Sequence, residues 1–246
     1  MRKFWFFLIT LSCSANVFGS LQSSTFSNAS PAGIVELVCV DEALAKRTLS
    51  RGGVLETKIP GIPDIVLVAA HGLTAEHENC TIVMGETELG VSEVIQGKGG
   101  RPIDDWAILT LDGRFDSRVH RLQWFASTSS YWGSAITDKV NIRLVKHSNG
   151  ESGRACTVRA PAGDLLDSTD RGTILLSDCI SIPGMSGAPA LVAVDDVPTL
   201  VGLNIGTRYN MALNTEEESR ANVIRLIDDV IERAIVRAIA VQVNPP

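Results

Sequence analysis

The chain of 246 residues has no surplus of positive charge: 22 Lys and Arg face 28 Asp and Glu, which gives a formal net charge of −6. Nothing in this balance favours binding to nucleic acid or to an anionic membrane surface, and we predict neither partner. Metal ligands are also sparse, because the four histidines and five cysteines form no CxxC motif and no His/Cys cluster. We therefore expect no metal site and no cofactor.

The sequence also lacks an uninterrupted apolar run of the roughly 20 residues that a membrane-spanning helix needs. It begins instead with Arg2 and Lys3, followed by the apolar run Phe4 to Leu11 and small residues around Gly19. This pattern predicts an export signal and hence a secreted or periplasmic protein with no stable membrane span. A membrane anchor is the alternative for this segment, and lipidation at Cys13 is a second.

Aromatic residues are scarce at 5% of the chain, whereas hydrophobic residues make up 45% and glycine occurs 21 times. Short apolar runs between turn residues favour an all-β body over a helix bundle. Two sets of six such runs, without a βαβ rhythm, predict two six-stranded antiparallel β-barrels with a cleft where their loops meet. The runs lie at 34–40, 53–57, 65–70, 80–84, 91–96 and 106–111, and then at 140–146, 155–160, 173–177, 190–194, 200–205 and 222–226.

Near the C-terminus the apolar residues change to a helical period, with Ile231, Ala234, Ile235 and Ala238 set between charged residues. This predicts one amphipathic helix packed against its own barrel, with a partner-binding helix as the alternative. We expect six segments in all. They are a signal peptide (1–19), a flexible N-terminus (20–32), a first barrel (33–115), an inter-barrel connection (116–137), a second barrel (138–226) and a C-terminal α-helix (227–241).

Removal of the signal would leave four cysteines, Cys39, Cys80, Cys156 and Cys179. An even number in an oxidising compartment predicts two disulfides, although four cysteines allow three pairings. Cys156 and Cys179 flank successive strand-like runs and could face each other across a hairpin, which would leave Cys39 to pair with Cys80. Buried free thiols are the alternative.

Three short segments carry residues suited to nucleophilic catalysis. His71 ends a strongly apolar run, Asp105 precedes another, and Ser186 stands between Gly184 and Gly187. A rigid strand could present the imidazole as a base, a buried carboxylate could orient it, and a glycine-flanked turn could expose a hydroxyl. The structural alternatives are a surface histidine, a turn capped by Asp104 and Asp105, and an ordinary Gly/Ser turn.

In this order the segments resemble the chymotrypsin/trypsin-like family of serine endopeptidases, and its bacterial-style members in particular. The family's Thr-Ala-Ala-His, Asp-Ile-Ala-Leu-Leu and Gly-Asp-Ser-Gly-Gly-Pro segments correspond here to 68–71, 105–109 and 184–189. The resemblance spans about residues 33–226, and it places the acid at Asp105 rather than Asp104.

The resemblance implies a role for each residue. Ser186 would attack the scissile carbonyl, His71 would move the proton, and Asp105 would orient His71. The amides of Gly184 and Ser186 would form the oxyanion hole, and a protein or peptide would be the substrate. The residues that would line the specificity pocket contain no carboxylate, so an uncharged pocket is expected; they are Ile180, Ser181, Asn204, Ile205 and Gly206.

One departure from the family concerns activation. Met185 stands where many members carry an Asp that pairs with a newly freed N-terminus, so we expect an enzyme that is competent without that ion pair.

Two other functions are alternatives to the protease. A protease homologue that only binds is one, and an α/β-hydrolase is the other. The hydrolase is disfavoured because Ala188 replaces the last Gly of its Gly-x-Ser-x-Gly elbow, and because His71 and Asp105 precede the serine.

Overall fold

The computed structural model of the chain describes residues 33–41, 46–73, 79–98, 100–126, 141–144, 156–160, 172–194, 197–206 and 222–244. The predicted signal peptide, the flexible N-terminus, Cys13 and residues 127–137 of the predicted connection lie outside these ranges. The boundaries of the six predicted segments stay predictions.

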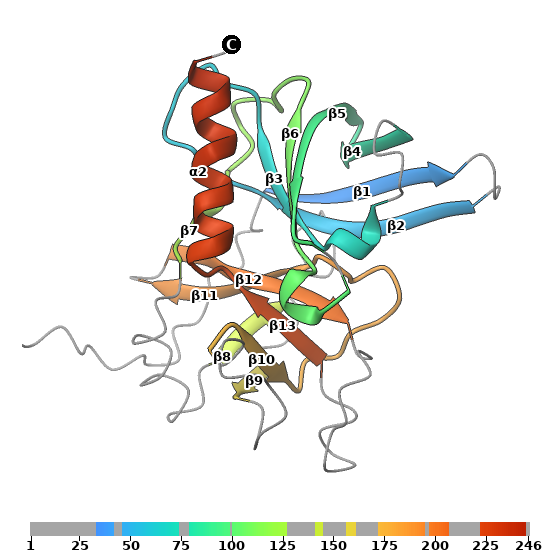
Figure 1. Cartoon of the computed structure of the whole chain (residues 1–246), viewed down its shortest axis with the longest axis vertical. Coiled ribbons are helices and arrows are strands. Elements are labelled where there is room, and N and C mark those ends of the chain that lie inside the picture. The colour runs from blue at the N-terminus through green and yellow to red at the C-terminus, as the bar shows by residue number, and fades with distance from the viewer. Residues whose placement is uncertain are drawn as a thin grey trace, which may run out of the picture.

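A closed antiparallel barrel forms the first half of the described chain (Figure 1). Its strands follow the order β1-β2-β3-β6-β5-β4. Their bounds are β1 (Ile34–Asp41), β2 (Lys46–Val54), β3 (Ile65–Val68), β4 (Cys80–Met84), β5 (Thr87–Gln96) and β6 (Ala107–Leu111). Two single-turn 3₁₀ helices accompany them, η1 (Ala70–Gly72) after β3 and η3 (Pro102–Asp104) before β6.

The second half forms another sheet, in which six strands pair in a closed cycle. The cycle runs β8-β9-β10-β13-β12-β11 and back to β8. These strands are β8 (Asn141–Leu144), β9 (Cys156–Arg159), β10 (Ile174–Ser177), β11 (Pro189–Val194), β12 (Val197–Gly206) and β13 (Asn222–Leu226). The two-residue strand β7 (Gln123–Trp124) joins β12 in parallel. The all-β double-barrel architecture expected from the sequence is confirmed, with β7 as an addition.

Strand β3 shows why one apolar run had to be continuous. Val66 and Val68 point into the first barrel, while Ile65 and Leu67 belong to a second cluster that lies between the barrels. Strand β6 is divided in the same way, and all residues of both strands are buried. Because side chains alternate along a strand, burial on both faces favours apolar residues at successive positions, and Thr110 of β6 is the one polar residue of these two strands.

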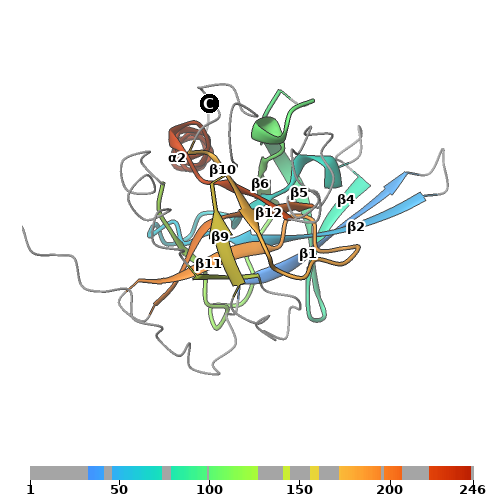
Figure 2. The same ribbon diagram turned by 90° about the horizontal axis from the view of Figure 1, so that it is seen from below.

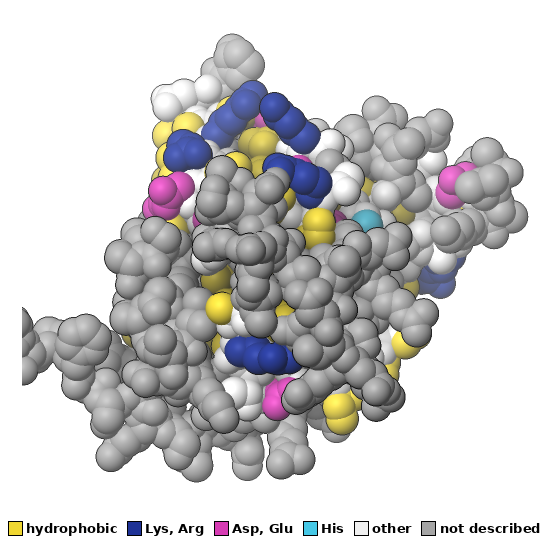
Figure 3. All heavy atoms as spheres, turned by 60° about the horizontal axis from the view of Figure 1, so that its bottom comes forward, with side chains coloured by type: hydrophobic (Ala, Val, Ile, Leu, Met, Phe, Trp, Pro, Cys, Tyr) yellow, Lys and Arg dark blue, Asp and Glu magenta, His cyan; other side chains and the backbone are white. Residues whose placement is uncertain are grey.

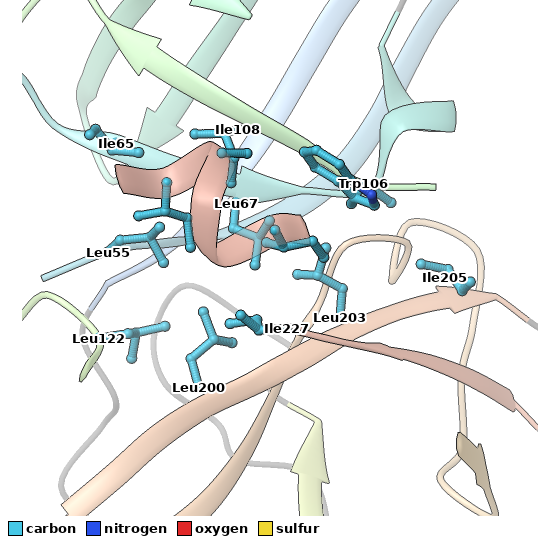
Figure 4. Close-up of a cluster of buried hydrophobic side chains, with 14 of the residues drawn as sticks. Leu55, Ile65, Leu67, Trp106, Ile108, Leu122, Leu200, Leu203, Ile205 and Ile227 are labelled. Carbon is cyan, nitrogen blue, oxygen red and sulfur yellow. The ribbon is translucent and has the colours of Figure 1, made fainter. Parts of the chain in front are cut away.

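The cluster between the barrels draws residues from both halves of the chain. Figure 4 shows Leu67, Trp106 and Ile108 of the first half close to Leu200 and Leu203 of the second. The C-terminal helix α2 (Asp229–Val243) adds its buried face to this cluster. The cluster therefore holds the two barrels together, and it fixes how loops from each barrel meet.

The helix begins two residues later than predicted, because Ile227 continues the sheet by donating its N–H to the Val201 carbonyl. Asp228 then caps the helix. The buried face of α2 packs within the chain, as expected, in the cluster between the barrels, and its main strand contacts are with β3 and β6 of the first barrel. In Figures 1 and 2, α2 lies on the opposite side of the first barrel from β4.

The second strand also differs from the prediction, since β2 begins at Lys46 and ends at Val54 where a run over 53–57 was expected. Gly52 and Gly53 lie inside the strand. A Cβ at Gly52 would lie 2.7 Å from a methyl group of Val68, so glycine is required for the strand to approach the barrel interior. Glycines normally end a strand pattern, so the sequence pattern did not reveal the true extent of β2.

Both expected disulfides are present, Cys39–Cys80 and Cys156–Cys179, with Cα–Cα distances of 4.1 and 5.1 Å. Cys39 and Cys80 are direct partners in the β1–β4 ladder. The β9–β10 register, in which Leu176 faces Arg159, brings Cys179 opposite Cys156 when it is extended by three residues. Neighbouring strands thus place each pair within bonding distance.

Candidate active site

His71 stands where strand β3 gives way to η1. Ala69 still has extended backbone angles, and the next residues turn into the single helical turn Ala70–Gly72. The buried strand anchors this turn, while the His71 side chain keeps 43% of its surface exposed. A rigid strand therefore delivers a partly solvent-accessible imidazole to the edge of the first barrel.

Asp105 holds His71 through both carboxylate oxygens. Oδ2 lies 2.7 Å from the ring atom Nδ1, and Oδ1 accepts the backbone N–H of His71 at 2.9 Å. The Asp105 side chain is only 5% exposed. One buried carboxylate thus orients the imidazole and also fixes the main chain from which it projects.

Asp104, the alternative acid, has a different partner. Its Oδ2 lies 3.2 Å from Nε of Arg101 in an exposed pair one turn back along η3. Of the two adjacent carboxylates, the structure brings only that of Asp105 to His71 among the contacts of the described residues.

The electrostatics of this pair favour the protonated imidazole. The hydrogen bond to Asp105 raises the pKa of His71 above its ordinary value of 6.5, and partial burial opposes this rise. A base of this kind takes up a proton readily and holds the resulting cation next to a carboxylate.

Ser186 lies in a tight turn between β10 and β11. Gly184 and Gly187 have φ angles of +85° and +76°, values that side-chain-bearing residues rarely adopt. Met185 is 1% exposed and packs into the core of the second barrel. Ser186 itself is partly buried. The two glycines let the chain reverse on each side of an anchored methionine and carry Ser186 to the surface of the turn.

The serine turn docks onto the first barrel beside the His71 segment. The Arg51 N–H of β2 donates to the Ser186 carbonyl at 2.7 Å. A Cβ at Gly187 would collide with the Arg51 carbonyl and would lie 3.1 Å from the Ala69 nitrogen, two residues before His71. The structure therefore brings the three sequence-predicted segments to one junction between the barrels.

The amides of this turn fall into two groups. Those of Met185, Gly187 and Ala188 donate to the carbonyls of Ile182, Asn204 and Met185. Among the backbone hydrogen bonds of the described residues, the amides of Gly184 and Ser186 have no carbonyl acceptor. Two amides without a carbonyl acceptor in one tight turn could bind a negatively charged oxygen.

The residues expected to line a specificity pocket separate into exposed and buried ones. Ile180 is 71% exposed, and Gly206 has open space where a Cβ would lie. Ile205 is buried in the inter-barrel cluster. Asn204 is fully buried, and its Nδ2 donates to Ser181 Oγ and to the Met185 carbonyl, each at 2.9 Å. Asn204 is therefore a brace for the serine turn.

Sequence reasoning missed Arg51, whose main chain holds Ser186. Its guanidinium is buried, with Nε and Nη1 lacking a hydrogen-bond partner. Burial lowers the pKa of Arg51, and Glu36 on the paired strand opposes this. No pattern along the chain could have found this residue, because its contact with Ser186 spans the two barrels.

Within the described residues, no group of three or more His, Cys, Asp or Glu side chains could hold a metal ion. No helix in that part of the chain is both long and apolar enough to cross a membrane. Basic, acidic and hydrophobic side chains all occur on the face shown in Figure 3.

No family model and no curated protein matches the chain. Among solved structures, it is similar to the Rv3671c protease from M. tuberculosis in its active form. The two chains are 13% identical, the match covers 89% of this chain and 82% of the other, and the TM-score is 0.49. At this level the likeness carries nothing about the reaction.

Proposed function

We propose that this chain is a serine-type endopeptidase that hydrolyses peptide bonds through an acyl-enzyme. The observation that carries the proposal is that Asp105 forms two hydrogen bonds with His71, beside a turn in which Ser186 lies between Gly184 and Gly187. A base, its orienting acid and a hydroxyl on a sharp turn are the parts that the reaction needs.

In the proposed mechanism, Nε2 of His71 takes the proton from Ser186 Oγ as that oxygen attacks the scissile carbonyl. The carbonyl oxygen becomes an oxyanion, which the amides of Gly184 and Ser186 stabilise. The imidazolium, held by Asp105, then gives its proton to the leaving amine, and the C–N bond breaks. Water activated by His71 releases the acyl group from Ser186.

The proposal includes export to an oxidising compartment. Two disulfides support it, since such bonds persist in secreted and periplasmic proteins and are rare in the cytosol. The apolar segment after Arg2 and Lys3 would then be the signal that directs export.

We also infer a preference for an uncharged residue at the cleavage site. Ile180 and Ile182 are exposed on the segment before Ser186, and Leu49 of β2 lies 3.9 Å from the Cβ position of Gly184. Apolar side chains at these places favour apolar over charged substrate groups. Cleavage of a peptide library should select uncharged side chains, and selection of Arg, Lys or Glu would contradict the inference.

A fluorophosphonate probe tests the proposed reaction. The folded chain should take up one phosphonyl group on Ser186, and Ser186→Ala should take up none and lose about a millionfold in turnover. Ser92→Ala is the matched control, because the Ser92 hydroxyl donates to the Thr110 and Leu111 carbonyls of the first barrel, away from the serine turn.

The control variant should label and hydrolyse an unfolded protein substrate as the parent does. If the folded parent is neither labelled nor active, the chain is a binding homologue and the proposal fails. The proposal also fails if Ser186→Ala remains active.

A further inference from the structure

Arg225 is the most deeply buried large polar side chain of the described residues, and it lies outside the site itself. It belongs to β13 and is 1% exposed. Its Nε donates to the Ile103 carbonyl at 2.6 Å, and its Nη2 lies 2.9 Å from Oδ2 of Asp228. Nη1 adds bonds to the carbonyls of Thr173 and Leu226. Because each nitrogen of the guanidinium donates a hydrogen bond, the group is held in one orientation.

The bond to Ile103 reaches the turn that carries the acid of the proposed site. Ile103 is the central residue of η3, two positions before Asp105, and the Asp105 N–H donates back to the Pro102 carbonyl at 3.3 Å. In Figure 1 this turn, between β5 and β6, lies beside β13. Arg225 therefore bridges 122 positions of sequence, from the second barrel to the acid turn of the first.

On its other side, Arg225 is fixed by the start of the C-terminal helix. Asp228 uses Oδ2 for Arg225 and Oδ1 for the N–H groups of Val230 and Ile231, each at 3.1 Å. A helix N-terminus favours a carboxylate at this position, so the helix anchors Asp228 and Asp228 anchors Arg225.

Hydrogen bonds, joined by the main chain of η3, thus connect α2 to the imidazole. It passes from Asp228 to Arg225, to η3 and Asp105, and finally to His71. A buried ion pair contributes little net stability compared with apolar side chains of the same volume. Stability therefore does not explain why Arg225 and Asp228 occur at this place. The proposed base and acid belong to the first barrel, whereas the proposed nucleophile belongs to the second.

We propose that Arg225 is a positioning residue that clamps the acid turn of the first barrel to the second barrel, so that Asp105 keeps both of its bonds to His71 in line with Ser186. The catalytic consequence rests on the proposed function, but the effect on His71 does not. Removal of the guanidinium would take away this directional bond between β13 and η3, and the apolar contacts of Ile103 with the inter-barrel cluster do not set direction. Small misplacements of this kind reduce turnover far more than they reduce substrate binding.

The test compares Arg225→Met with Arg121→Met. Arg121 is a matched control because it also forms a mostly buried pair with a carboxylate, Asp64, at 2.7 Å, but its other bonds go to the Val119 and Phe115 carbonyls, in a loop after β6. Proton NMR of the His71 ring is the first measurement. It follows the Nδ1 proton and the pKa, and it requires no substrate.

We expect Arg225→Met to lower the His71 pKa and to weaken the Nδ1 proton signal, while Arg121→Met leaves both as in the parent. If the chain is active, kcat in Arg225→Met should fall roughly 10- to 100-fold with little change in KM. An unaltered His71 in folded Arg225→Met would overturn the inference. Equal changes in both variants would do so as well, because they would indicate a general loss of stability.

Asp228→Asn provides a second test, in which the Arg225 side chain stays in place but loses its carboxylate partner. Asparagine caps helices about as well as aspartate, so the helix start is kept while the charge that fixes Arg225 is lost. The His71 pKa should fall in the same direction but by less than in Arg225→Met, and no shift at all would contradict the clamp. If the predicted NMR changes appear but neither the parent nor any variant hydrolyses peptide bonds, the proposed function alone fails.

Discussion

The two oxygens of the Asp105 carboxylate each accept one hydrogen bond from His71, one from the ring and one from the main chain. The bond to the main chain ties η1 to the start of β6, and the bond to the ring selects the tautomer with a proton on Nδ1. Nε2 is then left as the atom that can accept a proton. Disturbing either bond should therefore change the chemistry of the site in a measurable way.

Asp105→Asn should keep the fold and lose activity. An amide can replace one of the two acceptors, but its NH₂ group cannot accept the Nδ1 proton and favours the wrong tautomer. In a Ser-His-Asp triad of the trypsin type the same exchange lowers kcat about 10⁴-fold, and we expect a loss of that order here. Asp104→Asn is the control, since Asp104 pairs with exposed Arg101, and its kcat should be close to that of the parent.

Activity should rise with pH as His71 loses its proton. Because the bond to Asp105 raises the pKa of His71, the midpoint of kcat/KM against pH should lie above 6.5. The stability of the fold should change in the opposite direction. The charged His71–Asp105 pair stabilises the folded state at low pH, and this contribution is lost as the pH rises through the His71 pKa. NMR titration of His71 should give the same midpoint. A flat activity profile from about pH 5 to 9 would remove His71 from the mechanism.

Gly187→Ala should unfold more readily and lose activity. Its Cβ would collide with the Arg51 carbonyl in a backbone conformation with φ of +76°. Gly85→Ala is the matched control, because Gly85 has φ of +61° but nothing within 4 Å of its Cβ position. Strain alone should cost the control about 1 kcal/mol, and the collision should add to that cost in Gly187→Ala. Urea unfolding measures both, and equal losses would show that the contact with β2 is unimportant.

The two disulfides should differ in their effect on catalysis. Replacing Cys39 and Cys80 with Ser should cost about 2–4 kcal/mol of stability and leave the kcat of the proposed reaction unchanged in the folded protein, because the bond joins two barrel strands. Replacing Cys156 and Cys179 should lower kcat as well, since Cys179 precedes the segment that leads to Ser186. Thermal unfolding and turnover of both double variants decide this, and the same kcat in both would refute it.

Removal of residues 20–31 should leave turnover unchanged. Met185 cannot pair with an N-terminal ammonium, and the serine turn is held instead by burial of Met185 and by the bond from Asn204 to its carbonyl. Chains that begin at residues 20 and 32 should therefore have equal kcat/KM. A large loss in the shorter chain would indicate that the N-terminus takes part in activation.

Much of the fold could be predicted from local pattern. Apolar runs identified strands such as β3 and β6, and the 3.6-residue period found the helix, because periodicity records which side chains of an element are buried. The pairing of Cys156 with Cys179 was suggested by an expected hairpin and is confirmed, and Cys39–Cys80 is the pair that remained, although the cysteine count left three pairings open. Strand β2 was misplaced, since Gly52 is explained by the approach of Val66 and Val68 and Gly53 by that of Leu122 and Pro189, all on other parts of the chain.

The residues of the candidate site could be proposed from their types and order in the sequence, but the contacts that hold them in place could not. The sequence by itself determined the double-barrel architecture, the presence of His71, Asp105 and Ser186, and the neutral residues before the serine. Tertiary structure alone decided that α2 packs on the first barrel, that Asn204 braces the serine turn, and that Arg51 and Arg225 each fasten one barrel to the other. The reason is physical: a periodic pattern shows that a face is buried, but the partner that buries it comes from a distant part of the chain.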